Sequence, residues 1–183
     1  MKLMVLLVLA LAVSAVPLQA QDGTIALYFT EDGLNYSRYV DFSDFTIEAY
    51  VIVYVEDIVT GALYRLEMDG IDVMVISETY TPGSIVIGDM LSGVAVSLPF
   101  PESGFGGEPV FVGTVTFLNL AAPGVPEVDF QIVPHPTQGT PVYSDASFLM
   151  QPLTGLSSGI GVGAGVPDTD HEFTWGRVKS LYR

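Results

Sequence analysis

Hydrophobic and polar residues alternate along most of the chain from residue 24 to residue 148, at the two-residue period of β-strands. The longest such run, residues 45–55, carries apolar side chains at every second position. Its other side begins with Thr46 and Glu48 and then becomes apolar, which is typical of a strand that enters a covered sheet from an exposed rim. No stretch of a dozen residues in this range keeps the 3.6-residue period of an amphipathic helix. The pattern predicts an all-β protein.

Nine segments carry this strand pattern, and most are separated by Gly, Pro, Asp and Ser residues that favour turns. The segments are residues 24–29, 45–55, 62–68, 72–77, 84–87, 94–98, 110–118, 128–133 and 142–148. A domain of this size buries roughly two-thirds of its unfolded surface when two sheets pack face to face. We therefore expect a single antiparallel β-sandwich over residues 21–150.

The first twenty residues predict a signal peptide. Lys2 precedes an apolar run over residues 3–16, and Ala20 is the small residue that signal peptidases prefer at the cleavage point. An uncleaved membrane anchor is the alternative, but the run is shorter than the roughly 20 residues that span a bilayer. We expect cleavage before Gln21 and a protein that is secreted, periplasmic or at the cell surface, with no membrane span after cleavage.

Charge and composition exclude several function classes. The chain has 21 Asp and Glu residues, 6 Lys and Arg residues, no Cys and 49% hydrophobic residues. The hydrophobic content argues against a disordered acidic chain, and the missing Cys excludes disulfides and thiol nucleophiles. Between residues 21 and 170 the only bases are Arg38 and Arg65, so no basic patch is available to neutralise phosphates. Nucleic acid is therefore excluded as a partner.

No residue pattern of a catalytic site stands out, and we expect that the protein is not an enzyme. Neither His135 nor His171 stands beside a serine or acid pattern of a catalytic triad. Three pairs of acids fall at the ends of predicted strands: Asp41 with Asp44, Glu56 with Asp57, and Asp69 with Asp72. Acids at such positions commonly serve the turns themselves, although calcium prefers the same oxygen ligands. The sequence predicts no catalytic residue and no cofactor, with calcium as the alternative.

Four segments resemble, in order and spacing, the strands of cohesin modules of secreted bacterial proteins. They are residues 47–68, a strand followed by a short stretch ending in Gly and a second strand, and the later segments 84–89, 93–98 and 110–117. The resemblance extends over roughly residues 44–133. It implies a nine-strand jelly-roll sandwich and a role in protein–protein attachment, because cohesins bind dockerin modules through one sheet face.

The composition changes after Phe148. Residues 151–167 are rich in Gly, with Pro and Ser, and predict a flexible linker. Residues 168–183 place acids first and bases last, the order that complements a helix dipole, and predict an amphipathic C-terminal tail. The partner-binding candidates in this tail are Trp175, Arg177, Lys179, Leu181 and Tyr182. Packing of Trp175 back onto the sandwich is an equally open alternative.

Two functions follow from these predictions. The first is an exported, non-enzymatic interaction module that holds a protein partner through a sheet face, an edge strand or the C-terminal tail. The alternative is a carbohydrate-binding sandwich with polysaccharide as its partner, calcium-stabilised or not, in which exposed tyrosines stack on sugars. The tyrosines concerned are Tyr28, Tyr36, Tyr39, Tyr50, Tyr54, Tyr64, Tyr80 and Tyr143.

Overall fold

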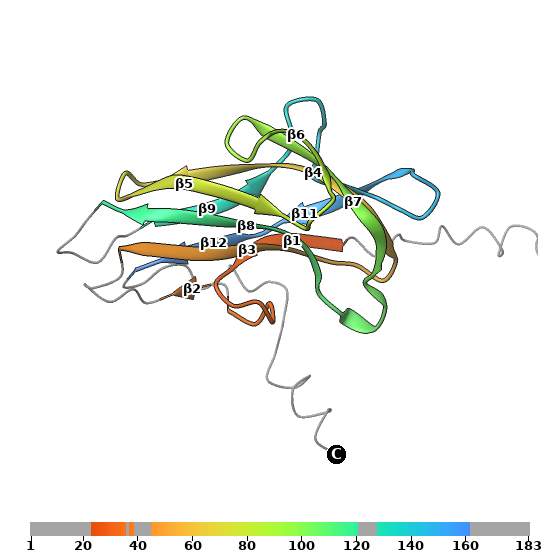
Figure 1. The fold of residues 1–183 in the computed structure, drawn as a ribbon, viewed down its shortest axis with the longest axis horizontal. Coiled ribbons are helices and arrows are strands. Elements are labelled where there is room, and N and C mark those ends of the chain that lie inside the picture. Colours follow the sequence, from red (N-terminus) through yellow and green to blue (C-terminus); the bar gives the residue numbers. More distant parts are fainter. Residues whose placement is uncertain (1–22, 36, 39–44, 121–127, 162–183) are drawn as a thin grey trace, which may run out of the picture.

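Strands make up nearly all of the regular structure in the computed structural model, which describes residues 23–35, 37, 38, 45–120 and 128–161 (Figure 1). The strands are β1 (Gly23–Tyr28), β2 (Ser37–Arg38), β3 (Thr46–Tyr54), β4 (Ile58–Asp69), β5 (Val73–Tyr80), β6 (Ile85–Asp89), β7 (Gly93–Ser103), β8 (Val110–Asn119), β9 (Val128–Val133), β10 (Val142–Ser144), β11 (Met150–Gly155) and β12 (Ser157–Ile160). A short 3₁₀ helix, Phe105–Gly107, precedes β8. Each of the nine predicted segments contains at least part of an observed strand, and the all-β prediction is confirmed.

The strands form two layers that are joined along one side. One layer runs β5-β8-β3-β1, and the other runs β6-β7-β4-β9-β12 with β2 at its far end. Strands β10 and β11 carry the hydrogen bonding from β4 to β1 and so connect the layers. Among the described strands only the β1–β11 and β2–β12 pairs are parallel. The predicted sandwich is confirmed, as one sheet folded over on itself.

The core lies between the two layers and follows the predicted alternation. Phe117 of β8 and Phe130 of β9 meet there with ring centroids 4.8 Å apart. In β3 the inward residues from Ile47 to Val53 are fully buried, whereas Phe45, just before the strand, is exposed. Alternate residues of a strand point to opposite faces, so the apolar side of residues 45–55 became the inner face of its layer.

The first correction concerns the start of β4. The predicted strand begins at residue 62, whereas β4 already includes Thr60 and Gly61. A Cβ atom at Gly61 would collide with the carbonyl oxygen of Val96 in β7. Glycine is needed here because the backbones of β4 and β7 approach closely. Glycine inside a strand can therefore mark close packing and not only a turn.

The segment 142–148 is not one strand as predicted. Strand β10 ends at Ser144, and a turn leads into β11. The carboxylate of Asp145 accepts hydrogen bonds from the backbone N–H of Ser147, at 2.8 Å, and of Leu149, at 2.9 Å. These bonds offer the backbone an alternative to the strand ladder, so the apolar residues beyond Ser144 leave the sheet.

The predicted flexible linker over residues 151–167 is wrong for its first ten residues. Strand β11 pairs with β1 and β10, and β12 pairs with β9, so residues 151–160 belong to the sandwich. A Cβ atom at Gly155 would collide with the carbonyl oxygen of Ile132, so this glycine permits close packing of two strands. Residues 162–167 lie outside the described residues.

The signal peptide, residues 1–20, and the C-terminal tail, residues 168–183, also lie outside the described residues. The structure therefore does not place Trp175, Arg177, Lys179, Leu181 or Tyr182, and the predictions about them stay predictions. Over the part of the chain that is described, no helix is long and apolar enough to cross a membrane.

Candidate interaction surface

The outer face of the layer β6-β7-β4 carries apolar side chains next to one another, which we call the apolar patch. Its members are the exposed Ile85 and Ile87, the half-buried Leu63 and Ala95, and Val142, which is buried at the β10 end. The strand register places Ile87 opposite Ala95, Ala95 opposite Leu63, and Leu63 opposite Val142. Cross-strand partners share one face of a sheet, so these four side chains form a row across β6, β7, β4 and β10.

The two isoleucines of the apolar patch are its most exposed members. Ile85 is 68% exposed and Ile87 is 69% exposed. Their neighbour Val86 lies opposite the buried Val96, on the inner face. The patch is therefore not a piece of core that happens to be uncovered, since the core-facing positions of these strands are different residues. An apolar surface of this kind marks an interaction site in soluble proteins more often than chance.

The same outer face becomes acidic farther along β4, and we call Glu67, Asp69 and Asp129 the acidic end. Arg65 forms an ion pair with Glu67. Asp69 lies directly opposite Asp129 of β9. Like charges at directly opposed positions destabilise a sheet, so a basic group placed over these two carboxylates would be stabilising. The outer face thus combines an apolar half with an acidic half.

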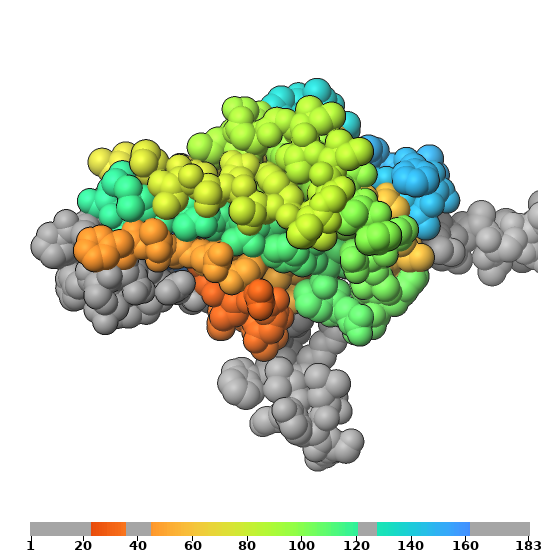
Figure 2. Space-filling view, viewed as in Figure 1, coloured from red at the N-terminus to blue at the C-terminus, as the bar shows by residue number. Residues whose placement is uncertain are grey.

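Strand β6 lies at the edge of its layer, since β7 is its one partner among the described strands. All five of its residues are exposed. In Figure 2, β6 and β7, in light green, lie at the surface above β5, in yellow. The carboxylate of Asp89, at the end of β6, accepts a hydrogen bond from Ser92 N at 2.8 Å. This bond lowers the pKa of Asp89, so the carboxylate is charged at neutral pH.

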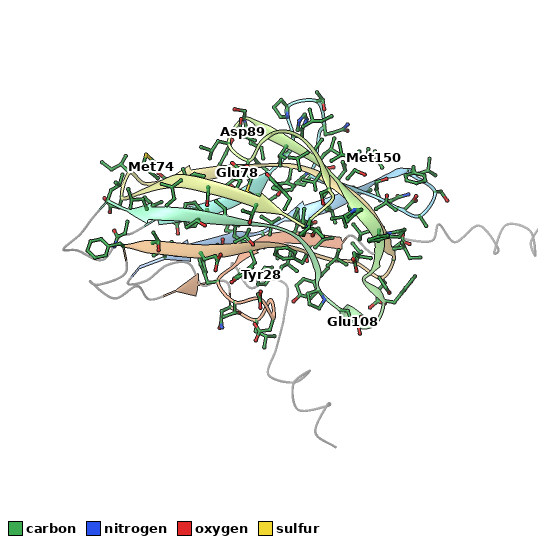
Figure 3. All side chains as sticks on the ribbon, in the orientation of Figure 1. Tyr28, Met74, Glu78, Asp89, Glu108 and Met150 are labelled. Atoms are coloured by element: carbon green, nitrogen blue, oxygen red, sulfur yellow. The ribbon has the colours of Figure 1, made fainter. Side chains whose placement is uncertain are left out.

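Glu78 of β5 connects the two layers on the side where no strand joins them. Its carboxylate accepts hydrogen bonds from Met90 N, at 3.1 Å, and from the hydroxyl of Tyr80, at 2.8 Å. Figure 3 labels Glu78 and also Asp89, the residue that precedes Met90. Burial is the main cause that raises the pKa values of Tyr80 and of the fully buried Tyr64. Both hydroxyls are therefore neutral at neutral pH.

The tyrosines predicted to stack on sugars do not gather on one exposed face. Tyr28 and Tyr64 are fully buried, and Tyr143 is nearly so. Tyr50 and Tyr54 are half-buried on the outer face of β3, where the Tyr54 hydroxyl donates to the carbonyl oxygen of Gly33 at 3.1 Å. Tyr80 lies on the inner side of β5, and Tyr36 and Tyr39 lie outside the described residues. A sugar platform built on these side chains would need a flat exposed ring, which none of the described ones offers.

Of the three pairs of acids, Glu56 and Asp57 hold distant parts of the chain in place. Glu56 accepts a hydrogen bond from Gly106 N at 3.0 Å, and Asp57 accepts one from the Tyr143 hydroxyl, also at 3.0 Å. Asp41 and Asp44 lie outside the described residues. Within the ranges that are described, no group of three or more His, Cys, Asp or Glu residues could hold a metal ion. His135 contacts Thr137, with 2.8 Å between Nδ1 and Oγ1.

Gly155, Ser157 and Gly159 match the Gly-x-Ser-x-Gly spacing of a nucleophile elbow, a motif that the sequence-based predictions did not include. An elbow requires a sharp turn from a strand into a helix, with the serine at its tip. Ser157 instead begins β12 and lies opposite Gln131 of β9. These residues therefore form no elbow.

The turn between β10 and β11 is a further exposed feature that the strand pattern did not predict. Phe148, Leu149 and Met150 are exposed there, and Phe148 is 76% exposed. Phe148 has a φ of 61°, a left-handed backbone that is uncommon for a bulky residue. Asp145 holds the turn, because Gln151 Nε2 also donates to its carboxylate at 2.8 Å. The signal for this turn was the sequence Asp145-Ala-Ser147.

No family model matches the chain, and no curated protein matches it either. Among solved structures, a cohesin module from a Clostridium perfringens family 33 glycoside hydrolase is similar, with 13% sequence identity and a TM-score of 0.54. The match covers 76% of this chain and 95% of that module. The sixth cohesin of Acetivibrio cellulolyticus scaffoldin B, in complex with the Cel5 dockerin, has 9% identity, a TM-score of 0.47, and coverage of 73% and 94%. The chain has a cohesin-like β-sandwich fold, as the sequence resemblance implied.

Proposed function

We propose that this protein is an exported, non-enzymatic interaction module that holds a protein partner on the outer face of the layer β6-β7-β4-β9. The observation that carries the proposal is the apolar patch beside the acidic end on that one face. Ile85 and Ile87 supply exposed apolar area, and Asp69 opposite Asp129 supplies negative charge. A matching partner presents apolar side chains flanked by Lys or Arg.

The apolar patch and the acidic end would contribute to binding in different ways. Covering one isoleucine contributes about 1.5–3 kcal/mol, so the apolar patch would supply most of the affinity. Exposed charges at a rim contribute less affinity but speed the encounter with an oppositely charged partner. We therefore expect association that slows as the salt concentration rises, because salt screens the acidic end.

The cohesin-like fold supports a protein partner rather than a polysaccharide. The scaffoldin cohesin named above was solved with a dockerin, which is itself a protein module. The buried or half-buried state of the described tyrosines weighs against the polysaccharide alternative. Glu56 and Asp57, between β3 and β4, accept hydrogen bonds from the 3₁₀ helix and from β10, which supports a structural rather than a catalytic role.

The test is partner capture with a variant of the apolar patch. Leu63→Lys places a charge at the centre of the patch, and Leu120→Lys, at an exposed leucine after β8, is the matched control. In crosslinking capture from the native host's exterior, we expect a protein partner that is retained by the control and lost from Leu63→Lys. Equal thermal midpoints would show that both variants fold.

Three results would contradict the proposal. The first is equal capture of the partner by Leu63→Lys and by the control. The second is retention of the protein on a polysaccharide gel, which would favour the carbohydrate alternative. The third is reproducible turnover that a single Asp or Glu substitution abolishes.

A further inference from the structure

We propose that the protein forms a symmetric homodimer in which β6 pairs antiparallel with β6 of a second copy, centred on Val86. The proposal concerns the free edge of the layer and does not depend on the partner of the outer face. Its basis is the unprotected edge of β6 and the order of the side chains along that strand.

The edge of β6 carries no Lys, no Pro and no β-bulge, and its one charged residue, Asp89, lies at the end of the strand. Natural edge strands commonly carry Lys, Pro or a β-bulge, which prevent pairing with another chain. Strand β6 reads Ile-Val-Ile-Gly-Asp, pairs with β7 without a register shift, and exposes every residue. Strand β5, at the edge of the other layer, has a register shift between Val75 and Ser77 and carries Glu78. One edge is therefore protected and the other is open.

The side chains of β6 suit pairing with a copy of the same strand. In an antiparallel pair centred on Val86, Ile85 lies opposite Ile87 of the second copy, and Ser84 lies opposite Gly88. Asp89 then lies opposite Gly83, so no two carboxylates meet at directly opposed positions. This matters in a chain of net charge −15. In a two-fold symmetric dimer, both copies contribute the same surface, and in this register both contribute the edge of β6.

The geometry also predicts how the dimer is arranged. The two-fold axis of such a pair runs perpendicular to the sheet, so the outer faces of both copies point the same way. Ile85 and Ile87 of the two copies then become neighbours, and the two apolar patches join. A strand of five residues is about 17 Å long, so the contact is smaller than a standard interface of roughly 1,600 Å². We expect a reversible dimer with a dissociation constant in the micromolar range.

A cysteine crosslink tests the register directly. The chain contains no Cys, and opposed residues of an antiparallel pair have Cα atoms about 4.5–5.5 Å apart, within the range that a disulfide bridges. The full-length variant Val86→Cys should therefore oxidise to a covalent dimer. Ile71→Cys, at an 88% exposed residue between β4 and β5, is the control for random collision. Equal crosslinking of the two variants would overturn the proposal.

Sedimentation of the full chain tests the dimer without a crosslink. We expect a monomer–dimer equilibrium over micromolar to sub-millimolar concentrations, abolished by Ile87→Lys and retained by Ile71→Lys. Both substitutions lower the net negative charge equally, so general repulsion would weaken in both, and a loss in one alone locates the contact at β6.

Every other outcome overturns the proposal. A chain that stays monomeric across this range has no such dimer, and dimerisation that survives Ile87→Lys uses another surface. A monomer that captures a different protein through β6 would show that the edge takes a foreign strand. Failure of the proposed function is separate, because it is read from partner capture by Leu63→Lys, which leaves the β6 edge unchanged.

Discussion

Tyr143 shows how single residues tie the elements together. Its hydroxyl donates to the carboxylate of Asp57, which joins β10 to the turn between β3 and β4. Burial, followed by the hydrogen bond to Asp57, raises the pKa of Tyr143 to about 12. An unfolded chain releases the same proton near pH 10. The folded state therefore holds this proton over a range of pH in which the unfolded state has lost it.

This difference predicts an alkaline loss of stability. Below about pH 10 both states hold the proton, and the contribution of Tyr143 is fully present. As the pH rises from about 10 to 12, the unfolded state gains free energy by ionising, and the folded state is destabilised. Tyr143→Phe should flatten this part of the curve and cost about 1–2 kcal/mol at neutral pH through the lost hydrogen bond. Urea unfolding at several pH values measures both, and an unchanged slope in the variant would refute the prediction.

At the scale of elements, the hairpin formed by β10 and β11 contains one residue in an unfavourable backbone conformation. Phe148 has a left-handed backbone, at φ 61°, and its ring is mostly exposed. The turn is nevertheless held, because Asp145 accepts three hydrogen bonds from within it. The bond from Gln151 and then that from Leu149 lower the pKa of Asp145, so the acceptor is charged at neutral pH.

Substitution of Phe148 should reveal the cost of this conformation. Phe148→Gly relieves the left-handed conformation and removes few contacts, so we expect a gain of up to about 1 kcal/mol in the free energy of unfolding. Leu149→Gly is the control, since Leu149 is also exposed but has no positive φ, and it should lose about 0.5–1 kcal/mol. Chemical denaturation compares them, and a loss of stability in Phe148→Gly would mean that the ring makes contacts that matter.

For the whole molecule, the boundary of the sandwich lies later in the chain than the glycine content indicated. Strand β11 completes the connection between the two layers, and β12 pairs with β9. The buried side chains Leu153 and Ile160 belong to these strands and pack in the core. Residues up to 160 are therefore part of the folded domain, and the prediction of a docking tail applies only beyond them.

Two truncations test this boundary. Ending the chain after residue 161 should cost less than about 2 kcal/mol, the scale of burying one large side chain, if Trp175 does not pack on the sandwich. Ending it after residue 150 removes β11 and β12 and should abolish the cooperative thermal transition. A large loss from the first truncation would show that the tail belongs to the domain, and a folded product from the second would contradict the role of these strands.

The sequence by itself determined most of the strands before residue 145 and which side of them faces the core, but it missed β2, β11 and β12. Residues 45–55 illustrate this, because the two-residue period is a local property and the inner face of β3 follows directly from it. The absence of cysteine excluded disulfides and thiol nucleophiles, and the scarcity of bases excluded nucleic acid as a partner. These conclusions rest on composition, which can be read without knowing the fold. The turn at Asp145 lay at the limit of such inference, because the polar signal competed with a run of apolar residues.

Only the tertiary structure decided which strands are neighbours and what their outer faces present. Leu63 and Ile87 share one row because β7 lies between their strands, and Asp69 faces Asp129 because β4 pairs with β9. Gly61 and Gly155 lie where two backbones approach closely, whereas the sequence pattern placed both outside the predicted strands. Register and close approach depend on residues far apart in the chain, so no local pattern could specify them.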